Sequence, residues 1–96
     1  MKIVGRNTLD AYRRQHPAAR KPVESWLAEA ESARWATPKQ IKDRYASASF
    51  LAGNIVIFNI KGNDHRLEVI VAYRTSVVVV QWIGSHVEYD ARNRRR

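Results

Sequence analysis

The sequence predicts a single α+β domain, in which one face of an antiparallel sheet packs against N-terminal helices and a short helix ends the chain. Three observations predict this class. Apolar residues recur at helical spacing before residue 46 and alternate as in strands after residue 54. Short turns separate the strand-like segments, as they do between antiparallel neighbours. One face of these segments is wholly apolar and should contact the helices. The 96 residues suffice for one modest core.

The chain is expected to begin with an edge strand and a short helix. Lys2–Gly5 is a brief apolar start, typical of a strand at a sheet edge. Asn7 or Thr8 can cap the helix that follows, because their side chains accept hydrogen bonds from free backbone N–H groups. This helix is expected to stop near His16–Pro17, since proline disfavours a helical residue before it.

Two further helices and a loop are expected before the sheet. The second helix should run from Ala18 to Trp35, on the evidence of an amphipathic stripe. Thr37–Gln40 has the pattern of a capping box with proline at the first helical position, so a short third helix should end near Tyr45. Ala46–Gly53, rich in small residues, is expected to be a loop. The stripe of the second helix consists of Val23, Trp26, Leu27, Ala30 and Ala33.

Three strands should form an antiparallel meander. Ile55–Ile60 is rich in β-branched residues and ends at the turn signal Lys61–Asn63. Arg66–Tyr73 should be the next strand, and Val77–Ile83 the last, with the turn Arg74–Ser76 between them.

Alternation gives this sheet two unlike faces. The apolar face is predicted to carry Val56, Phe58, Ile60, Leu67, Val69, Val71, Val78, Val80 and Trp82. The other face is predicted to carry Asn59, Lys61, Arg66, Glu68 and Gln81, mixed with Ile55, Ile57, Ile70 and Val79. We expect no helix to cover this second face, which is therefore the candidate functional surface.

The chain should end in a helical turn and a basic tail. Ser85–Glu88 is a second capping box, so helix should begin at His86. His86 and Tyr89 are three positions apart and share one side of that helix. Because the helix starts where the last strand ends, both side chains should reach the rim of the partly polar face. Asn93–Arg96 is the basic tail.

The composition favours a polyanionic partner. Lys and Arg number 17 against 9 Asp and Glu, a formal net charge of +8. A solvated basic surface without a ligand is the structural alternative. No cysteine is present, which excludes a disulfide framework, a thiol nucleophile and a cysteine-based zinc site. No apolar run approaches the roughly 20 residues of a membrane span, and no signal peptide is recognisable, so a cytoplasmic location is expected.

The polar residues near the sheet have the chemistry to cleave RNA without a metal or another cofactor. That reaction needs a base for the 2′-OH, an acid for the leaving 5′-oxygen, and cations for the charge on the phosphorane. Arg66 and Lys61 suit the cationic role. His86 is the one candidate of a residue type whose reference pKa is near neutrality. Tyr89 is a proton donor, a phosphate-orienting group or a stacking surface. A carboxylate, Glu68 or Glu88, is a further candidate base or holds an arginine in place.

Each of these residues also has a structural interpretation. His86 is equally consistent with an ordinary first residue of a capped helix. Arg66 and Glu68 are consistent with a solvated charge pair. Asn63 suits a left-handed turn conformation. Tyr89 and the tryptophans occur more often in cores than as stacking platforms. His16 and His65 are expected in a loop and on the strand surface. The residues alone therefore favour contact with nucleic acid and leave catalysis open.

Two motifs resemble a known family. Asn59–Leu67 carries N-x-x-G-N-x-x-R, and Trp82–Asp90 carries G-[ST]-H-x-x-Y-D. Together they resemble the HigB family of type II toxins, which are mRNA interferases of the wider RelE-like group. The likeness extends over nearly the whole chain. Ser85 replaces a frequent threonine, which is conservative for a cap, and His65 replaces a common aromatic residue, either keeping a stacking role or adding a titratable group.

The resemblance implies a RelE-like fold, with an antiparallel sheet and two N-terminal helices packed on one face. It implies cleavage of mRNA in the ribosomal A site and neutralisation by a HigA-type helix-turn-helix antitoxin. Carried over by motif position, the implied site is Lys61, Asn63, Arg66, His86 and Tyr89, with Asn59 in support. We therefore expect Lys61, Arg66, His86 and Tyr89 to be catalytic, and Asn59, Asn63, His65, Gln81 and Arg92 to contact RNA.

The main rival function is a non-catalytic basic module that binds RNA or the ribosome. A DNA-binding regulator is less favoured, because no basic recognition helix follows a tight turn.

Overall fold

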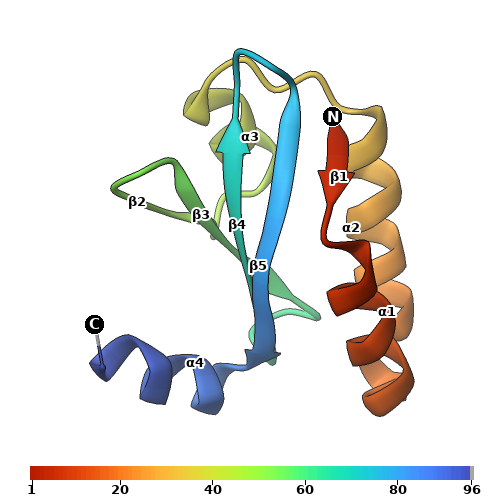
Figure 1. The fold of residues 1–96 in the computed structure, drawn as a ribbon. Helices are drawn as coiled ribbons and strands as arrows, with labels where there is room; N and C mark the ends of the chain where they lie inside the picture. The colour runs from red at the N-terminus through yellow and green to blue at the C-terminus, as the bar shows by residue number, and fades with distance from the viewer. Residues whose placement is uncertain (96) are drawn as a thin grey trace.

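The structure is a computed structural model and describes residues 1–95 (Figure 1). In this range a five-stranded sheet is accompanied by four α-helices and a short 3₁₀ helix, η1. The elements in chain order are β1 (Lys2–Val4), α1 (Arg6–Gln15), η1 (Pro17–Ala19), α2 (Arg20–Ser32), α3 (Pro38–Arg44), β2 (Ser49–Leu51), β3 (Ile55–Ile60), β4 (His65–Ala72), β5 (Val77–Ser85) and α4 (His86–Arg94).

The sheet is mixed, whereas the sequence predicted an antiparallel one. Its strand order is β1-β5-β4-β3-β2, and the pairs from β5 to β2 are antiparallel, which confirms the predicted meander. The pair β1–β5 is parallel, with Ile3 opposite Val78. Parallel neighbours need a long crossover connection, and the whole chain between β1 and β5 supplies it.

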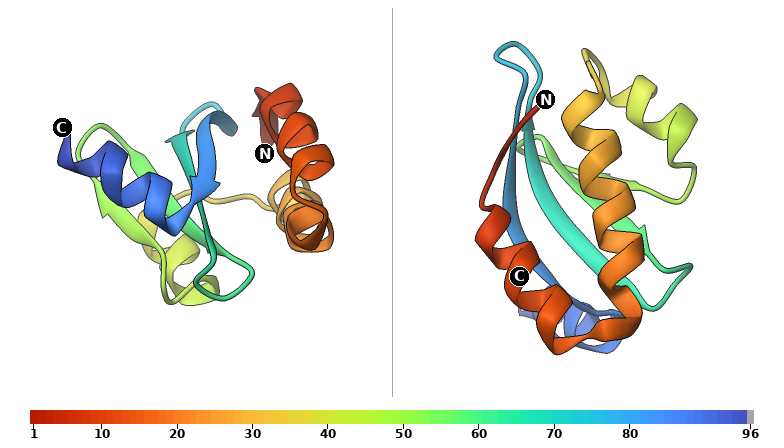
Figure 2. Two further views of the ribbon diagram at one scale, coloured as in Figure 1. Left: turned by 90° about the horizontal axis from the view of Figure 1, so that it is seen from below. Right: turned by 90° about the vertical axis from the view of Figure 1, so that its right-hand side faces the viewer.

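One face of the sheet carries the hydrophobic core. Helices α1 and α2 lie side by side (Figure 2) and contact one another, β1 and β5. Their buried residues join the alternating apolar residues of β3, β4 and β5 in one cluster, which also receives Trp35 and Ile41. Its members from the helices include Leu9, Tyr12, Val23, Trp26 and Leu27, and those from the sheet include Val56, Phe58, Leu67, Val69, Val78 and Val80.

Two predicted helix boundaries were wrong. The N-cap of α1 is Gly5, at φ 88°, and not Asn7 or Thr8. A Cβ atom on Gly5 would lie 2.9 Å from the Val80 carbonyl oxygen, so glycine permits both the left-handed conformation and a close approach to β5. The predicted second helix, Ala18–Trp35, is divided into η1 and α2, and it ends at Ser32 because Ala33 is already extended.

The segment around α3 was predicted well except for one strand. Thr37 caps α3 by accepting a hydrogen bond from the Gln40 N–H, which is one half of the predicted box. The Gln40 side chain accepts from the Ala36 N–H and not from the Thr37 N–H, so the other half is absent. The expected loop Ala46–Gly53 contains β2, which pairs with β3 as an edge strand. Three residues are too few to show a strand pattern without the partner strand.

The largest correction concerns β5. A register shift between β4 and β5 leaves Gln81 as a β-bulge, with Glu68 opposite Trp82 but Val69 opposite Val80. After a bulge the alternation of faces reverses. Trp82 therefore shares a face with Glu68, although the sequence predicted it on the apolar face, and Ile83 takes its place opposite Leu67 in the core.

The end of the chain is a nine-residue helix rather than a single turn. Both halves of the predicted capping box at Ser85 are present. Helix α4 contacts β4 and β5, and Figure 1 shows it across the sheet from α1 and α2. We call this side of the sheet the open face, although α4 covers one end of it, which the sequence did not predict. Asn93 and Arg94 of the expected tail belong to α4, and Arg96 lies outside the described residues.

Candidate functional site

The candidate site is built on two neighbouring rungs of the open face. Asn59, Arg66 and Gly84 face one another across β3, β4 and β5 on the rung nearer the sheet end. Ile57, Glu68 and Trp82 form the next rung. Helix α4 starts directly after β5, so its first two turns lie over these rungs. The strand register therefore places Arg66 and Trp82 on the same surface.

Arg66 is held by the turn that precedes β4. Its Nη1 donates to the Asn63 carbonyl oxygen at 2.8 Å, and its Nη2 donates to Asn63 Oδ1, also at 2.8 Å. A weaker bond joins Nη1 to the His65 carbonyl oxygen at 3.3 Å. A guanidinium has five N–H donors, so these bonds orient the group and leave donors for a phosphate. Asn63 thus positions Arg66, in addition to forming the turn.

Lys61 begins the same turn. Its backbone is left-handed at φ 53°, and Gly62 follows at φ 62°. The exposed ammonium group lies 3.4 Å from Asp64 Oδ2, a surface ion pair that a phosphate can displace at little cost. Lys61 and Asn59 also border a cavity of ≈ 150 Å³ beside α2 and α3.

His86 lies next to this turn at the start of α4. Its backbone N–H donates to the Asp64 carbonyl oxygen at 3.0 Å, which ties the helix start to the turn holding Arg66. The imidazole is exposed. Ser85 accepts from the Glu88 N–H, and Glu88 accepts from the Ser85 N–H at 2.8 Å. Hydrogen bonding of the Glu88 carboxylate to the Ser85 backbone N–H, and next to the Ser85 hydroxyl, lowers the pKa of Glu88 and keeps it ionised as the cap, so it is a poor candidate for a base.

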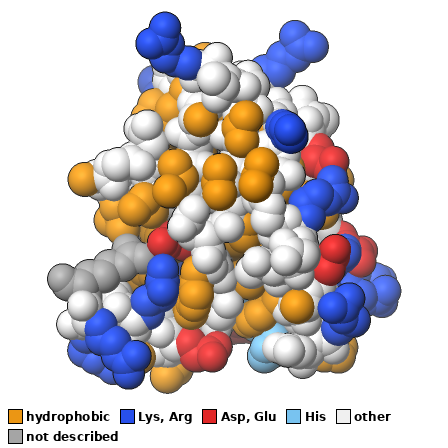
Figure 3. Space-filling view, viewed as in Figure 1, with side chains coloured by type: hydrophobic (Ala, Val, Ile, Leu, Met, Phe, Trp, Pro, Cys, Tyr) orange, Lys and Arg blue, Asp and Glu red, His pale blue; other side chains and the backbone are white. Residues whose placement is uncertain are grey.

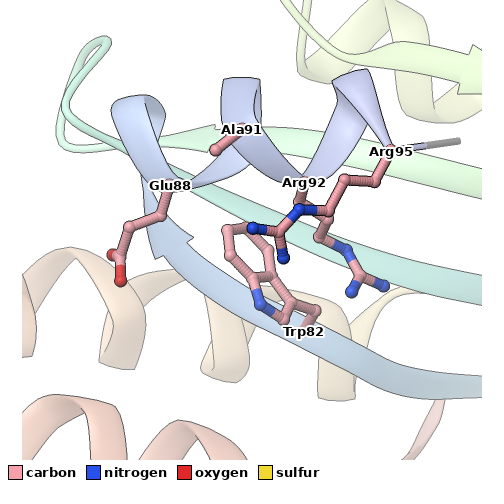
Figure 4. A pocket seen from close by; sticks show the side chains of 5 residues that line it. All are labelled: Trp82, Glu88, Ala91, Arg92 and Arg95. Atoms are coloured by element: carbon pink, nitrogen blue, oxygen red, sulfur yellow. The ribbon is translucent and has the colours of Figure 1, made fainter.

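Tyr89 and Arg92 pack around Trp82 (Figure 4 shows Arg92 and Trp82). The rings of Tyr89 and Trp82 are 6.1 Å apart. The Arg92 guanidinium carbon lies 5.3 Å from the centre of the Trp82 ring, and its Nη2 lies 3.4 Å from Glu68 Oε2. Glu68 is 3 % exposed, so its burial requires a partner of this kind. The open face thus carries an aromatic and cationic layer beneath α4.

His65 does not face this surface. His65 points to the helix side, where its Nδ1 lies 2.6 Å from the Tyr12 hydroxyl oxygen. His16 stacks on Tyr12 at 4.1 Å and meets His65 edge-on. Burial lowers the pKa of His65. Gln81 is exposed in the bulge, one residue beyond the two rungs.

Sequence reasoning missed Trp82 and Gly84 as site residues. A Cβ atom on Gly84 would lie 2.5 Å from Cη2 and 2.6 Å from Cζ2 of Trp82, so the indole occupies the space above this glycine. The signal was the spacing W-x-G at the end of a strand, since residues two apart share a face. The bulge hid this signal, because it reverses the face on which Trp82 and Gly84 lie. A bulge depends on the pairing of two strands and has no pattern in the local sequence.

The surface around the site is basic. Figure 3 shows Lys and Arg side chains gathered over α4, at the lower left of the view, and apolar side chains over the middle of the open face. Val4 and Leu51, which are 42% and 39% exposed, lie on the two edge strands, β1 and β2. An arginine fixed by a turn next to a helix N-terminus is a local arrangement suited to phosphate. The features define a small, basic α+β domain with a surface suited to a polyanion.

The comparison with family models assigns the chain. Residues 19–92 match the model of the HigB toxin family, described as the RelE-like toxic component of a toxin–antitoxin system. The matched range includes both rungs and all of the candidate residues. The chain therefore belongs to the HigB toxin family, and this membership implies an antitoxin partner.

Two further findings concern curated proteins and membrane-spanning helices. A search of curated proteins gave no significant match. Within residues 1–95, no helix is both long and apolar enough to cross a membrane.

Proposed function

We propose that this toxin is a ribosome-dependent endoribonuclease that cleaves translated mRNA and thereby stops translation and growth. The observation that carries the proposal is the Arg66 guanidinium, fixed by two 2.8 Å bonds to Asn63 beside the start of α4. Family membership supports the toxic role. The codon in the ribosomal A site would be the substrate.

The reaction would be an in-line attack within the RNA itself. The 2′-oxygen bonds to the phosphorus and the bond to the 5′-oxygen breaks, which leaves a 2′,3′-cyclic phosphate and a 5′-OH. A base removes the proton of the 2′-OH, and an acid gives a proton to the leaving oxygen. No metal is needed to balance these steps, because side chains move both protons.

Four side chains would share the work. Arg66 and Lys61 stabilise the additional charge of the phosphorane, and the N-terminus of α4 adds its partial positive charge. His86, exposed at that N-terminus, and Tyr89, one turn later, are the groups for proton transfer. Which of the two is the base stays open. Asn59, on the same rung as Arg66, would contact the RNA.

The ribosome would position the RNA. The groups at the turn lie close together, and they suit one phosphate rather than a length of strand. Bringing the codon into a fixed geometry accounts for a large share of the activation barrier, and the ribosome can provide that positioning. The antitoxin would be of the HigA type, with a helix-turn-helix domain, and would mask the toxin until it is removed.

The rival function is a basic module that binds RNA or the ribosome without cutting. Both functions use Arg66 and Lys61, but only cleavage needs His86 and Tyr89 at the same rim. Induction of the chain without its antitoxin separates them. We expect growth arrest, with new 5′-OH ends on a translated message and none on the same message with its start codon removed. Arrest with intact messages would favour the rival, and equal cutting of both messages would remove the ribosome from the mechanism.

A further inference from the structure

A cavity of ≈ 580 Å³ lies between α4 and β5. It is lined by Trp82, Glu88, Ala91, Arg92 and Arg95 (Figure 4). Its size falls in the range of about 300–1,000 Å³ that is usual for small-molecule sites. The Trp82 indole forms one wall, and the arginines of α4 project beside it.

The indole is placed there by two features of β5. The bulge at Gln81 turns Trp82 away from the core and onto the open face. Gly84, two residues later, leaves room for the ring, whose outer atoms would be 2.5 and 2.6 Å from any Cβ at that position. Gly84 is also the ladder partner of Arg66. The indole therefore extends toward the rung that carries the proposed phosphate ligand.

The polar groups at this cavity are mainly hydrogen-bond donors. Arg92 lies over the indole, with its guanidinium carbon 5.3 Å from the ring centre. Its Nε is buried and has no hydrogen-bond partner among residues 1–95. A guanidinium donates only, so this N–H lacks an acceptor, although Nη2 of the same group lies 3.4 Å from Glu68 Oε2. Arg95 adds a second guanidinium, whereas the Glu88 carboxylate accepts from the Ser85 N–H at 2.8 Å as part of the cap.

We propose that this cavity is a subsite for one unpaired nucleobase of the RNA, next to the phosphate that Arg66 binds. An aromatic ring beside arginines is the arrangement on which single-stranded bases stack, and base edges offer carbonyl and ring-nitrogen acceptors to guanidinium donors at the cavity. The proposal rests on the proposed function, because it takes the substrate to be RNA. It adds where the base next to the scissile phosphate lies.

Binding to uncleavable RNA tests the subsite without requiring catalysis. Two fluorescent pentanucleotides with 2′-O-methyl groups, identical except that one lacks its central base, are titrated with the purified chain at fixed salt. We expect the chain to bind the complete oligonucleotide about tenfold more tightly than the abasic one, as stacking of one base predicts. Trp82→Leu should remove this difference, and Trp82→Phe should keep most of it.

The matched control is Phe50→Leu, the same kind of change at an aromatic residue that is 36% exposed on β2, outside the cavity. It should leave both dissociation constants unchanged. Circular dichroism and thermal unfolding establish that each variant is folded. Equal binding of the two oligonucleotides by the natural chain, no binding of either at millimolar concentration, or full discrimination by Trp82→Leu would overturn the subsite.

The outcome is separable from that of the proposed function. A chain that discriminates the two oligonucleotides through Trp82 but never cuts messages on ribosomes has the subsite without the activity. A chain that cuts on ribosomes, with equal binding of the two oligonucleotides, has the activity without the subsite.

Discussion

Gly84 leaves the space that the Trp82 indole occupies. The shape of the candidate site therefore depends on this glycine. Its backbone is not left-handed, so the need for glycine is one of space alone. Gly84→Ala should cost about 1–3 kcal/mol of unfolding free energy, because the new methyl group displaces the indole. In a Trp82→Ala background the same change should cost much less. Urea denaturation of the four proteins measures this coupling, and equal costs in both backgrounds would show that Trp82 is not the obstacle.

At the residue scale, Arg66 has the central electrostatic role in the proposed reaction. Arg66→Ala should reduce cleavage on ribosomes by at least ~10²-fold, because one preorganised donor to a developing anion is worth a few kcal/mol. Arg74→Ala, in the exposed turn at the other end of the sheet, is the control for lost positive charge and should cut nearly normally. An unfolded Arg66→Ala variant by circular dichroism would assign the residue to the structure of the turn instead.

Two substitutions test the proposed proton-transfer roles of His86 and Tyr89 apart from any packing role. His86→Ala and Tyr89→Phe should each strongly reduce cleavage with little loss of stability, since His86 is exposed and Phe keeps the ring that faces Trp82. Their combined effect should be smaller than the product of the single effects if both serve one proton-transfer step. Full cleavage by both variants at matched protein concentration would contradict the proton-transfer roles.

Helix α4 and the turn before β4 act as one unit at the scale of elements. The Ser85 capping box fixes the helix start, and the bond from His86 to Asp64 fixes that start against the turn holding Arg66. On the other side of β4, the bond between His65 and Tyr12 fixes the same end of the sheet to α1. His65, expected to contact RNA, is thus in a position to stabilise the fold.

This link predicts a pH dependence of stability. Burial lowers the pKa of His65 below its ordinary value of 6.5, against the opposing effects of Asp64 and Glu88 and with the help of His16 and Lys61. The folded state therefore favours the neutral imidazole. The free energy of unfolding should fall as the pH drops through about 6.5 and level off below the folded pKa. Glu88 affects the free energy of unfolding in a separate pH range, below pH 4.5, because its pKa is lowered in the folded state.

Urea denaturation between pH 5 and 8 checks the prediction. His65→Gln should flatten the dependence, and the control His86→Gln, which changes an exposed imidazole, should leave it as it is. The same slope in the natural chain and in His65→Gln would assign the dependence to another group.

Local signals were sufficient for several elements. The cap at Thr37, the box at Ser85 and the turn at Lys61–Asn63 involve residues within a few positions of one another, and the structure has all three. The strands β3 to β5 were recognised from alternation. Features that depend on a distant partner strand were missed, namely the direction of β1, the strand β2 and the bulge at Gln81.

The same distinction applies to the site. Arg66, Asn63 and His86 were predictable, because one turn and one helix start bring them together. Trp82 was wrongly assigned to the core, and His65, expected to contact RNA, has its side chain hydrogen-bonded to Tyr12; tertiary structure is the reason in both cases. A bulge reversed the first side chain, and α1 supplied a partner for the second.

The whole molecule presents two unlike faces. On the helix side, α1 and α2 cover the sheet and bury the core, while the open face combines an exposed apolar region with arginines over α4 (Figure 3). The net charge of +8 favours polyanionic partners, such as the ribosome of the proposed function, and this attraction should weaken as salt rises. Affinity for RNA in general is therefore expected of this surface, and cleavage must be tested by itself.

The most direct test is cleavage in a purified translation system. A defined message is programmed into ribosomes with a known codon in the A site, and its 5′ ends are mapped after addition of the natural chain, Arg66→Ala or Arg74→Ala. We expect one cut within the A-site codon, a 2′,3′-cyclic phosphate on the upstream fragment, at least ~10²-fold slower cutting by Arg66→Ala, and near-normal cutting by Arg74→Ala. Intact message with the natural chain bound to ribosomes, or equal rates for the three proteins, would contradict the proposed enzyme.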